Sequence, residues 1–260
     1  MNTKLIKTKK GTAHLESIVT KEEIDLEKNH VVDEMIKTVS VKGFRQGKAP
    51  KAIAQKSLDP EKLSDHILNH VISHLLEHAV EENRFRLLGR PVLEELKVEK
   101  DGGWLVKIQL PLYPDIKLGD YSKYLKKKKS AKKEKAVEDV YQTLLDNEKV
   151  DISEHIINEE VNFSLERLST QAKSLNLPME EYLKALGKNL DQVKKEYRDS
   201  ADKSVRLDLI LLEIAKKENI DTTNEELLEL AKVSNIPAKQ MDQLRSIMNR
   251  RKTIDYLMKI

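Results

Sequence analysis

The chain has 260 residues, enough for one large domain or two ordinary ones, and 39% of them are hydrophobic, which suffices for a packed core. The absence of cysteine excludes disulfides, thiolate metal sites and a cysteine nucleophile, and it fits a reducing compartment. No apolar segment follows Met1 and no stretch reaches the ~18 apolar residues of a membrane span, so we expect a cytoplasmic protein without a membrane partner.

The net charge of +3 is distributed unevenly along the chain. Residues 1–116 are close to neutral, whereas residues 117–135 carry nine lysines against two acidic residues. Residues 136–260 carry an excess of Asp and Glu. A basic connector therefore joins a nearly neutral first half to an acidic second half.

The N-terminal residues predict two strands and a helix. Alternating strand residues cover 4–10 and 13–19, with a turn at Gly11 between them. Thr20 and Glu23 form the capping-box pattern that starts a helix, and apolar residues then recur at helical spacing as far as Val39. We expect this helix to end just before residue 41.

A basic loop flanked by glycines follows the predicted helix. Residues 35–58 contain six Lys and Arg and no Asp or Glu. Gly43 and Gly47 permit backbone angles that a side chain would forbid, so the loop can turn sharply and hold Phe44 and Arg45 outward. Such a loop suits a phosphate-rich surface. The alternative is an ordinary loop whose Phe packs into the core while its cations are solvated.

The next segments predict helices and a second strand pair. A short helix is expected near 51–56, and Asp59 with Pro60 predicts the start of a helix that runs to about Glu82. Two strands follow over 92–98 and 104–110, joined by an Asp-Gly-Gly turn. This order predicts an α+β domain, an antiparallel sheet with packed helices, that ends near residue 115.

From residue 136 onward the periodicity is helical. Helix starts are expected at Ser153, at Pro178, at Pro237, and at either Thr222 or Thr223. We therefore predict a mostly α-helical C-terminal domain over 136–260. Residues 116–135 are expected to form a solvated basic linker, with the start of a charged helix or an auxiliary rRNA contact as alternatives.

The second long predicted helix carries a histidine every four residues: His66, His70, His74 and His78. Two imidazoles one turn apart can chelate a metal, but a stable site needs a third or fourth ligand. A drift of about 40° per step predicts that His66 and His70 face solvent and that His78 approaches the apolar edge. We expect no metal site, and a polar or partner-facing helix surface instead.

The sequence contains none of the usual catalytic loops. It lacks the Gly-x-Ser-x-Gly elbow, the Walker-type phosphate loop and the dinucleotide fingerprint. Adjacent carboxylates on exposed elements are usually solvated. We therefore expect no catalytic residue and no cofactor.

Residues 43–48, Gly-Phe-Arg-Gln-Gly-Lys, followed by Pro50, resemble the ribosome-docking loop of the trigger factor family of bacterial chaperones. Weaker similarities cover residues 113–118, 179–183, 197–206 and 213–220. The resemblance implies an ATP-independent holdase that docks near the ribosomal exit tunnel and holds nascent or unfolded polypeptide. It assigns ribosome binding to Gly43, Phe44, Arg45, Gln46, Gly47 and Lys48.

The resemblance also implies domain roles and partners. Residues 1–115 would be a ribosome-binding domain that contacts rRNA and a tunnel-exit ribosomal protein, and residues 136–260 a client-binding chaperone domain; a homodimer is allowed. Full-length family members carry an inserted prolyl isomerase of the FK506-binding type, whose place is taken here by residues 116–135. We therefore expect no enzymatic activity. The alternative is an rRNA- or ribosome-binding assembly or translation factor without chaperone activity.

Methionines are candidates for client contact in the helical domain, because their flexible side chains adapt to irregular partners. The alternative is that each one packs in the core. The candidates are Met179, Met241, Met248 and Met258.

Overall fold

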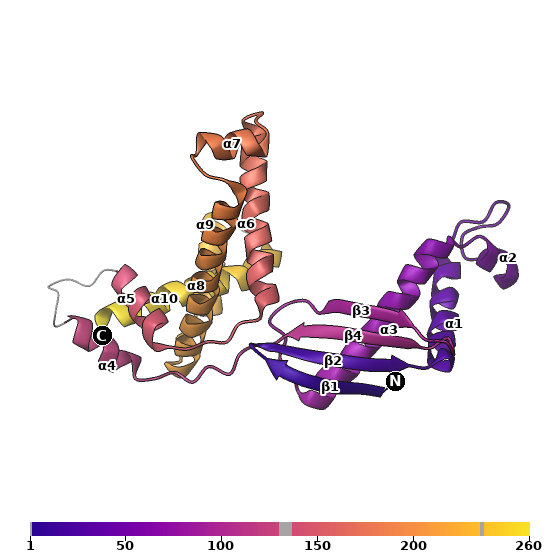
Figure 1. Cartoon of the computed structure of the whole chain (residues 1–260), viewed down its shortest axis with the longest axis horizontal. Helices are drawn as coiled ribbons and strands as arrows, with labels where there is room; N and C mark the ends of the chain where they lie inside the picture. Colours follow the sequence, from indigo (N-terminus) through magenta and orange to yellow (C-terminus); the bar gives the residue numbers. More distant parts are fainter. Residues whose placement is uncertain (1, 130–136, 235–236) are drawn as a thin grey trace. The chain divides into compact units, whose positions relative to one another are not determined.

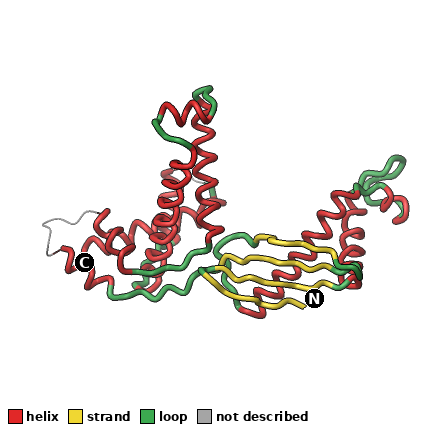
Figure 2. The backbone as a smooth tube through the Cα atoms, viewed as in Figure 1, coloured by secondary structure: helices red, strands yellow, loops and turns green. Residues whose placement is uncertain are grey.

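The computed structural model describes residues 2–129, 137–234 and 237–260 (Figure 1). Two compact units divide the chain, Met1–Tyr113 and Pro114–Ile260. Figure 2 shows strands and helices in the first unit, whereas the second contains helices joined by loops and no strand in the part that the structure describes. The predicted α+β class, an antiparallel sheet followed by a mostly helical remainder, is confirmed. None of the described helices has the length and apolar character needed to cross a membrane.

The N-terminal unit is built on a four-stranded antiparallel sheet with the order β1-β2-β4-β3. Its strands are β1 (Asn2–Lys9), β2 (Thr12–Val19), β3 (Val92–Val98) and β4 (Trp104–Pro111). Lys10 and Gly11 form the first turn, both with positive φ. The register of β2 against β4 runs from Thr12 opposite Pro111 to Val19 opposite Trp104, so the centre of the sheet joins two hairpins that are far apart in sequence.

Three helices lie between the two hairpins in sequence: α1 (Lys21–Thr38), α2 (Lys51–Lys56) and α3 (Pro60–Asn83). Both predicted caps are confirmed. Thr20 and Glu23 form a reciprocal capping box, with distances of 3.3 and 3.0 Å between backbone nitrogens and side-chain oxygens. The Asp59 carboxylate accepts the Glu61 backbone N–H at 3.0 Å, and Pro60 occupies the first turn of α3.

The core of this unit lies between the sheet and the helices α1 and α3, which contact each other. The strands contribute alternating apolar residues, and α3 contributes an apolar residue every four positions from Ile67 to Ala79. Burial of each large side chain stabilises the fold by about 1.5–3 kcal/mol. The large side chains that are fully buried in it are Val19, Val71, Leu75, Val106, Ile108 and Leu110.

The second unit contains α4 (Tyr121–Lys129), α5 (Val137–Asn147), α6 (Glu154–Ser174), α7 (Met179–Ala185), α8 (Leu190–Lys217), α9 (Asn224–Ser234), the 3-10 turn η1 (Ala238–Gln240) and α10 (Met241–Lys259). Helix α8 is central, because it contacts α5, α6 and α10. Its Ile210, Leu211 and Ile214 are fully buried. A buried stripe on one long helix therefore organises the unit.

The start of α9 resolves the choice between two threonines. Thr223 forms the capping box, since its backbone N–H donates to Glu226 Oε2 at 2.9 Å and its hydroxyl accepts the Glu226 N–H at 3.3 Å. Thr222 is fully buried instead, and its hydroxyl donates to Asn249 Oδ1 at 2.6 Å.

The structure places helix α4 in the segment for which we predicted a basic linker. Tyr121 and Leu125 lie one turn apart on α4 and are both buried, so an apolar face holds this part of the lysine-rich segment against its neighbours. The Tyr121 hydroxyl donates to Glu218, which also accepts the Tyr256 hydroxyl at 2.8 Å. Residues 130–135 of the predicted linker lie outside the described residues.

Replacement of Glu218 by Gln tests this anchor of α4. Hydrogen bonds from the Tyr121 and Tyr256 hydroxyls lower the pKa of Glu218 below its ordinary value of 4.5. We expect Glu218→Gln to lower the free energy of unfolding in urea by about 1–3 kcal/mol at pH 7, because both bonds lose their charged acceptor.

The same variant predicts a pH dependence. A carboxylate whose pKa is lowered by folding contributes stability that is present above pH 4.5 and is lost as the pH falls through the folded pKa. The difference between wild type and Glu218→Gln should therefore shrink below that pH. Glu229→Gln, an exposed position on α9, is the control that should change little. A difference that persists undiminished in acid would contradict this prediction.

Candidate functional site

The basic loop connects α1 to α2 and is built from consecutive turns. The Phe44 N–H donates to the Val41 carbonyl at 3.0 Å, and the Lys48 N–H donates to the Arg45 carbonyl at 2.9 Å. Gly43 and Gly47 have φ of +88° and +73°, values that side chains disfavour. The two glycines therefore supply the backbone conformations that the sequence predicted for them.

The base of the loop is attached to the end of α1. The Gln46 side-chain amide donates to the Thr38 carbonyl at 2.7 Å. A Cβ atom on Gly47 would lie 2.8 Å from the Lys37 carbonyl oxygen, closer than such contacts occur. On the other side, Lys51 at the start of α2 forms an ion pair with Asp33 of α1. These contacts fix both ends of the loop against α1 and so set the position of its tip.

Side chains at the tip of the loop point to solvent. Phe44 is 43% exposed, whereas Val41 at the base is only 8% exposed. The structure therefore places Phe44 at the surface and not in the core. Lys42, Arg45 and Lys48 are exposed, and within the described parts of the chain no carboxylate lies at ion-pair distance from them. An exposed ring thus stands among cations that remain available to an anionic partner.

Replacement of Gly47 by Ala tests the close approach to α1. Gly43 is the matched control, because it shares the positive φ but has no atom within 4 Å of an added Cβ. Both variants incur the cost of placing an L-residue at positive φ, about 1–2 kcal/mol. Gly47→Ala should lower the free energy of unfolding by at least about 1 kcal/mol more and increase amide hydrogen exchange at Lys48. Equal effects of the two variants would show that the approach to Lys37 is relaxed.

The histidine row does not lie as predicted. His70 is only 27% exposed and His78 is 68% exposed, so the expectation that His70 faces solvent and His78 the apolar edge is wrong. The reason is the packing of α1 against α3, which covers the face that carries His70. His66 is exposed.

Glu27 of α1 is the partner that the sequence did not reveal. Its two carboxylate oxygens lie 2.8 Å from His70 Nδ1 and 2.7 Å from His74 Nδ1. Burial raises the pKa of Glu27, but hydrogen bonds from His74 and His70 outweigh this effect, and the net pKa lies below the ordinary value. No local pattern signals the pairing, because α1 and α3 meet only in the folded unit.

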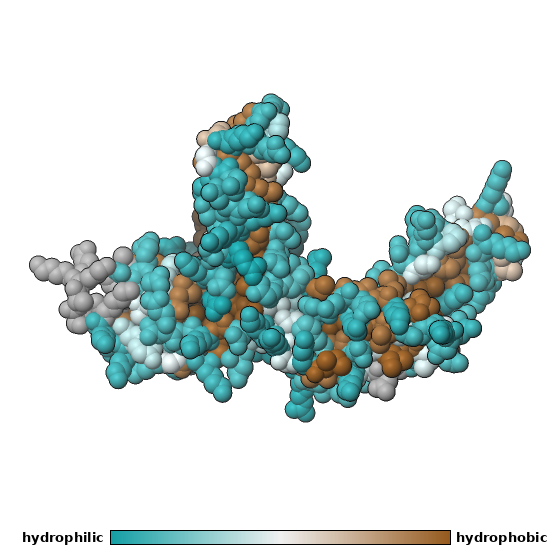
Figure 3. All heavy atoms as spheres, in the orientation of Figure 1, coloured by the Kyte–Doolittle hydropathy of each residue, from teal (hydrophilic) through white to brown (hydrophobic). Residues whose placement is uncertain are grey.

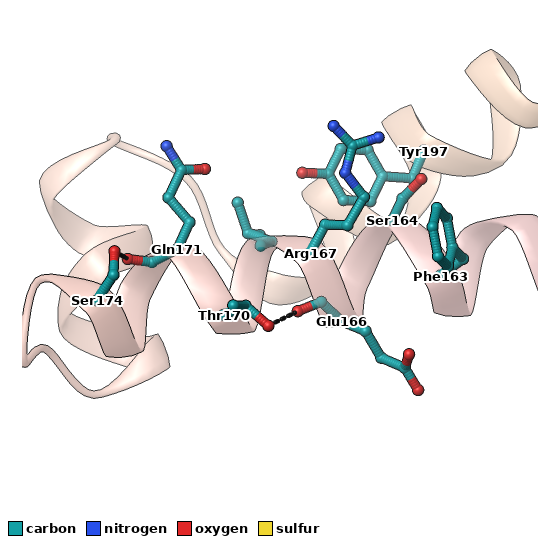
Figure 4. A pocket seen from close by; sticks show the side chains of 9 residues that line it. Phe163, Ser164, Glu166, Arg167, Thr170, Gln171, Ser174 and Tyr197 are labelled. Carbon is teal, nitrogen blue, oxygen red and sulfur yellow. Dashed lines mark hydrogen bonds between the residues drawn. The ribbon is translucent and has the colours of Figure 1, made fainter. Parts of the chain in front are cut away.

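The helical unit has a hollow on the surface of α6, closed on one side by Tyr197 of α8 (Figure 4). It measures about 720 Å³. In Figure 4, Ser164, Arg167 and Gln171 extend to one side of α6 and Glu166 to the other. Phe163 at its edge is 55% exposed. The hollow thus combines aromatic and polar groups on a rigid helix.

Exposed leucines gather around α7, where α6 leads into α8. Leu175, Leu177, Leu186 and Leu190 are between 36% and 57% exposed, and we name them the tip leucines. Beneath them the buried Leu168, Leu183 and Val193 form a small core. Figure 3 shows apolar side chains interspersed with hydrophilic ones on the visible face of this unit.

The methionines pack inward. Met179 contacts the core under the tip leucines, and Met241 and Met248 contact the cluster of Leu227, Ala231 and Leu244. Met258 is half-buried. Core packing, the alternative weighed for these residues, therefore describes Met179, Met241 and Met248. The exposed large apolar side chains of the described part of this unit are Phe163, several leucines, Val233 and Ile247.

Known proteins resemble both halves of the chain. The family model described as bacterial trigger factor protein matches residues 1–146, and that of the trigger factor C-terminus matches residues 121–259. A trigger factor from Carboxydothermus hydrogenoformans is 34% identical over 142 residues, which are 50% of this chain and 33% of that protein. One from Caldicellulosiruptor bescii is 32% identical over 114 residues, 44% of this chain and 26% of that protein. The chain thus matches about a third or less of the length of these relatives.

The fold has a solved counterpart. A structure from a study of promiscuous substrate recognition in folding and assembly activities of the trigger factor chaperone superposes with a TM-score of 0.66 at 13% identity. The match covers 100% of this chain and 99% of that one, and at this identity it shows the fold alone. Because the two family models each cover more than half of the sequence, the chain belongs to the trigger factor family.

Proposed function

We propose that the chain is an ATP-independent chaperone that docks on the ribosome through residues 43–48 and holds nascent or unfolded polypeptide with its helical unit. The observation that carries this proposal is the loop between α1 and α2. It presents a 43% exposed Phe44 beside exposed cations, in a chain of the trigger factor family.

The chemistry of the loop suits a ribosomal surface. The Arg45 guanidinium can bind a phosphate or a carboxylate through two parallel hydrogen bonds, and Lys48 adds a point charge. Phe44 can stack on an unpaired base or fill a protein pocket. Contacts of these kinds support rRNA and a tunnel-exit ribosomal protein as partners.

The tip leucines and the hollow beside Phe163 are the proposed client surface. Unfolded polypeptide exposes apolar side chains, and the exposed leucines offer apolar area without a nucleotide-driven step. The helices beneath hold this area in place through the core of Leu168, Leu183 and Val193.

Prolyl isomerisation is not part of the proposal. Residues 114–136, which separate the sheet from α5, are too few for an additional domain. Acceleration of a refolding reaction limited by a proline bond is the measurement that would reveal such an activity, and we expect none.

Two assays on the same preparation test the proposal. The chain should co-sediment with bacterial ribosomes, and without ATP it should suppress aggregation of a chemically unfolded protein on dilution. Co-sedimentation without suppression of aggregation would favour an assembly or translation factor. Failure of both assays would overturn the proposal.

A further inference from the structure

Helices α1 and α3 bring five side chains with metal-ligand chemistry together: Glu27, His30 and Glu34 from α1, and His70 and His74 from α3. Two overlapping groups share His70. In the first, ligand atoms of Glu27, His70 and His74 lie within 4.8 Å of one another, and in the second those of His30, Glu34 and His70 do. We propose that the chain binds one zinc-class divalent cation at Glu27, His70 and His74.

The geometry of the first group favours it over the second. Both imidazole Nδ1 atoms already point at one carboxylate, at 2.8 and 2.7 Å from its two oxygens. Ligand atoms of a tetrahedral zinc ion, with bonds of about 2.0–2.1 Å, lie about 3.3 Å apart, so each Nδ1 atom needs to lie only about 0.5 Å farther from the carboxylate oxygen that it now faces. Small side-chain rotations accomplish such a change without moving either helix.

The surroundings hold two of the ligands in place. The Glu27 side chain is only 14% exposed and that of His70 27% exposed, whereas His74 is 45% exposed and leaves one side open to solvent. His70 and His74 lie one turn apart on α3, and the packing of α1 against α3 supplies Glu27. A metal site needs ligands that their neighbours hold in place, and it needs a path by which the ion can enter.

His30 is a candidate for a fourth ligand, because it belongs to the second group and shares His70 with the first. Its ring centroid lies 5.0 Å from that of His70, which in turn lies 4.7 Å from the His74 ring. His30 is exposed and can rotate toward the ion, or water can complete the coordination. Two or three imidazoles with one carboxylate suit zinc, cobalt or nickel better than magnesium or calcium, which prefer oxygen ligands.

The test is a titration of the full chain, free of any affinity tag, with Zn²⁺ by calorimetry and with Co²⁺ by visible absorption. We expect one ion per chain and a cobalt spectrum typical of four ligands. Glu27→Gln, His70→Gln and His74→Gln should each weaken binding at least about tenfold, and the His70→Gln/His74→Gln double variant should abolish it. Glutamine retains the helix and hydrogen-bonding capacity.

Matched controls come from the same helix. His66→Gln and His78→Gln remove exposed imidazoles of the same row outside the Glu27 group and should leave the affinity unchanged. Circular dichroism without metal checks that every variant is folded. The proposal is overturned if no saturable binding occurs near one equivalent, or if the double variant binds as tightly as the wild type.

Discussion

Replacement of Phe44, Arg45 and Gln46 by alanine is expected to abolish co-sedimentation of the chain with ribosomes. The change removes the exposed ring, one cation of the loop tip and the side chain that binds the Thr38 carbonyl. Truncation of a hot-spot residue, a class in which aromatic side chains and Arg are enriched, costs about 2 kcal/mol or more, so loss of both Phe44 and Arg45 should exceed a factor of about 100 in affinity. Pelleting with a dilution series of ribosomes measures it directly.

Single variants separate the chemical contributions to docking. Arg45→Ala should reduce the slope of log affinity against log salt concentration by about 0.7–0.9 if Arg45 binds one phosphate. Phe44→Ala should weaken docking without changing that slope, because a ring releases no counterion. The two variants therefore distinguish electrostatic contact from stacking or packing.

The control removes a cation elsewhere in the N-terminal unit. Lys100 is exposed in the turn between β3 and β4, and Lys100→Ala changes the net charge as Arg45→Ala does. It should leave co-sedimentation intact. If the triple variant pelleted as well as the wild type, the docking role of the loop would be wrong; if Lys100→Ala were equally defective, binding would depend on overall charge.

Local signals in the sequence predicted much of the N-terminal unit. The capping box at Thr20, the Asp59-Pro60 start and the glycines at 43 and 47 all act through backbone geometry within a few residues, and the structure contains each of them. The strand pairs follow from period-two alternation. The candidate loop was predictable for the same reason, because its conformation depends on neighbouring residues.

Features that depend on tertiary contacts were not predictable. Glu27 lies 43 residues from His70 in sequence, so the histidine row alone concealed its partner. Helix α4 lies within a lysine-rich segment, yet Tyr121 and Leu125 are buried, α4 packs against α5, and the Tyr121 hydroxyl donates to Glu218, 97 residues further along the chain. Composition does not distinguish the methionines from the leucines as exposed apolar residues, and only packing decides which of them is covered.

Substitution of Leu175, Leu186 and Leu190 by glutamine is expected to weaken the suppression of aggregation. The chain concentration that halves light scattering should rise at least about tenfold. These tip leucines are 57%, 51% and 42% exposed, so they lose little packing when replaced, and the unfolding midpoint should shift little. An apolar client that buries them gains about 1.5–3 kcal/mol per fully covered side chain, and only part of this gain appears as affinity.

A matched variant decides whether the position of the exposed apolar groups matters. Leu228 and Val233 on α9 are 54% and 81% exposed, and their replacement by glutamine removes comparable apolar surface from the same unit. Retained activity of this control, with loss in the tip variant, would locate client binding around α7. If both variants lost activity equally, any exposed apolar group would serve. If neither did, the hollow lined by Phe163 and Tyr197 would be the surface to alter next, and the assignment of clients to the tip leucines would be wrong.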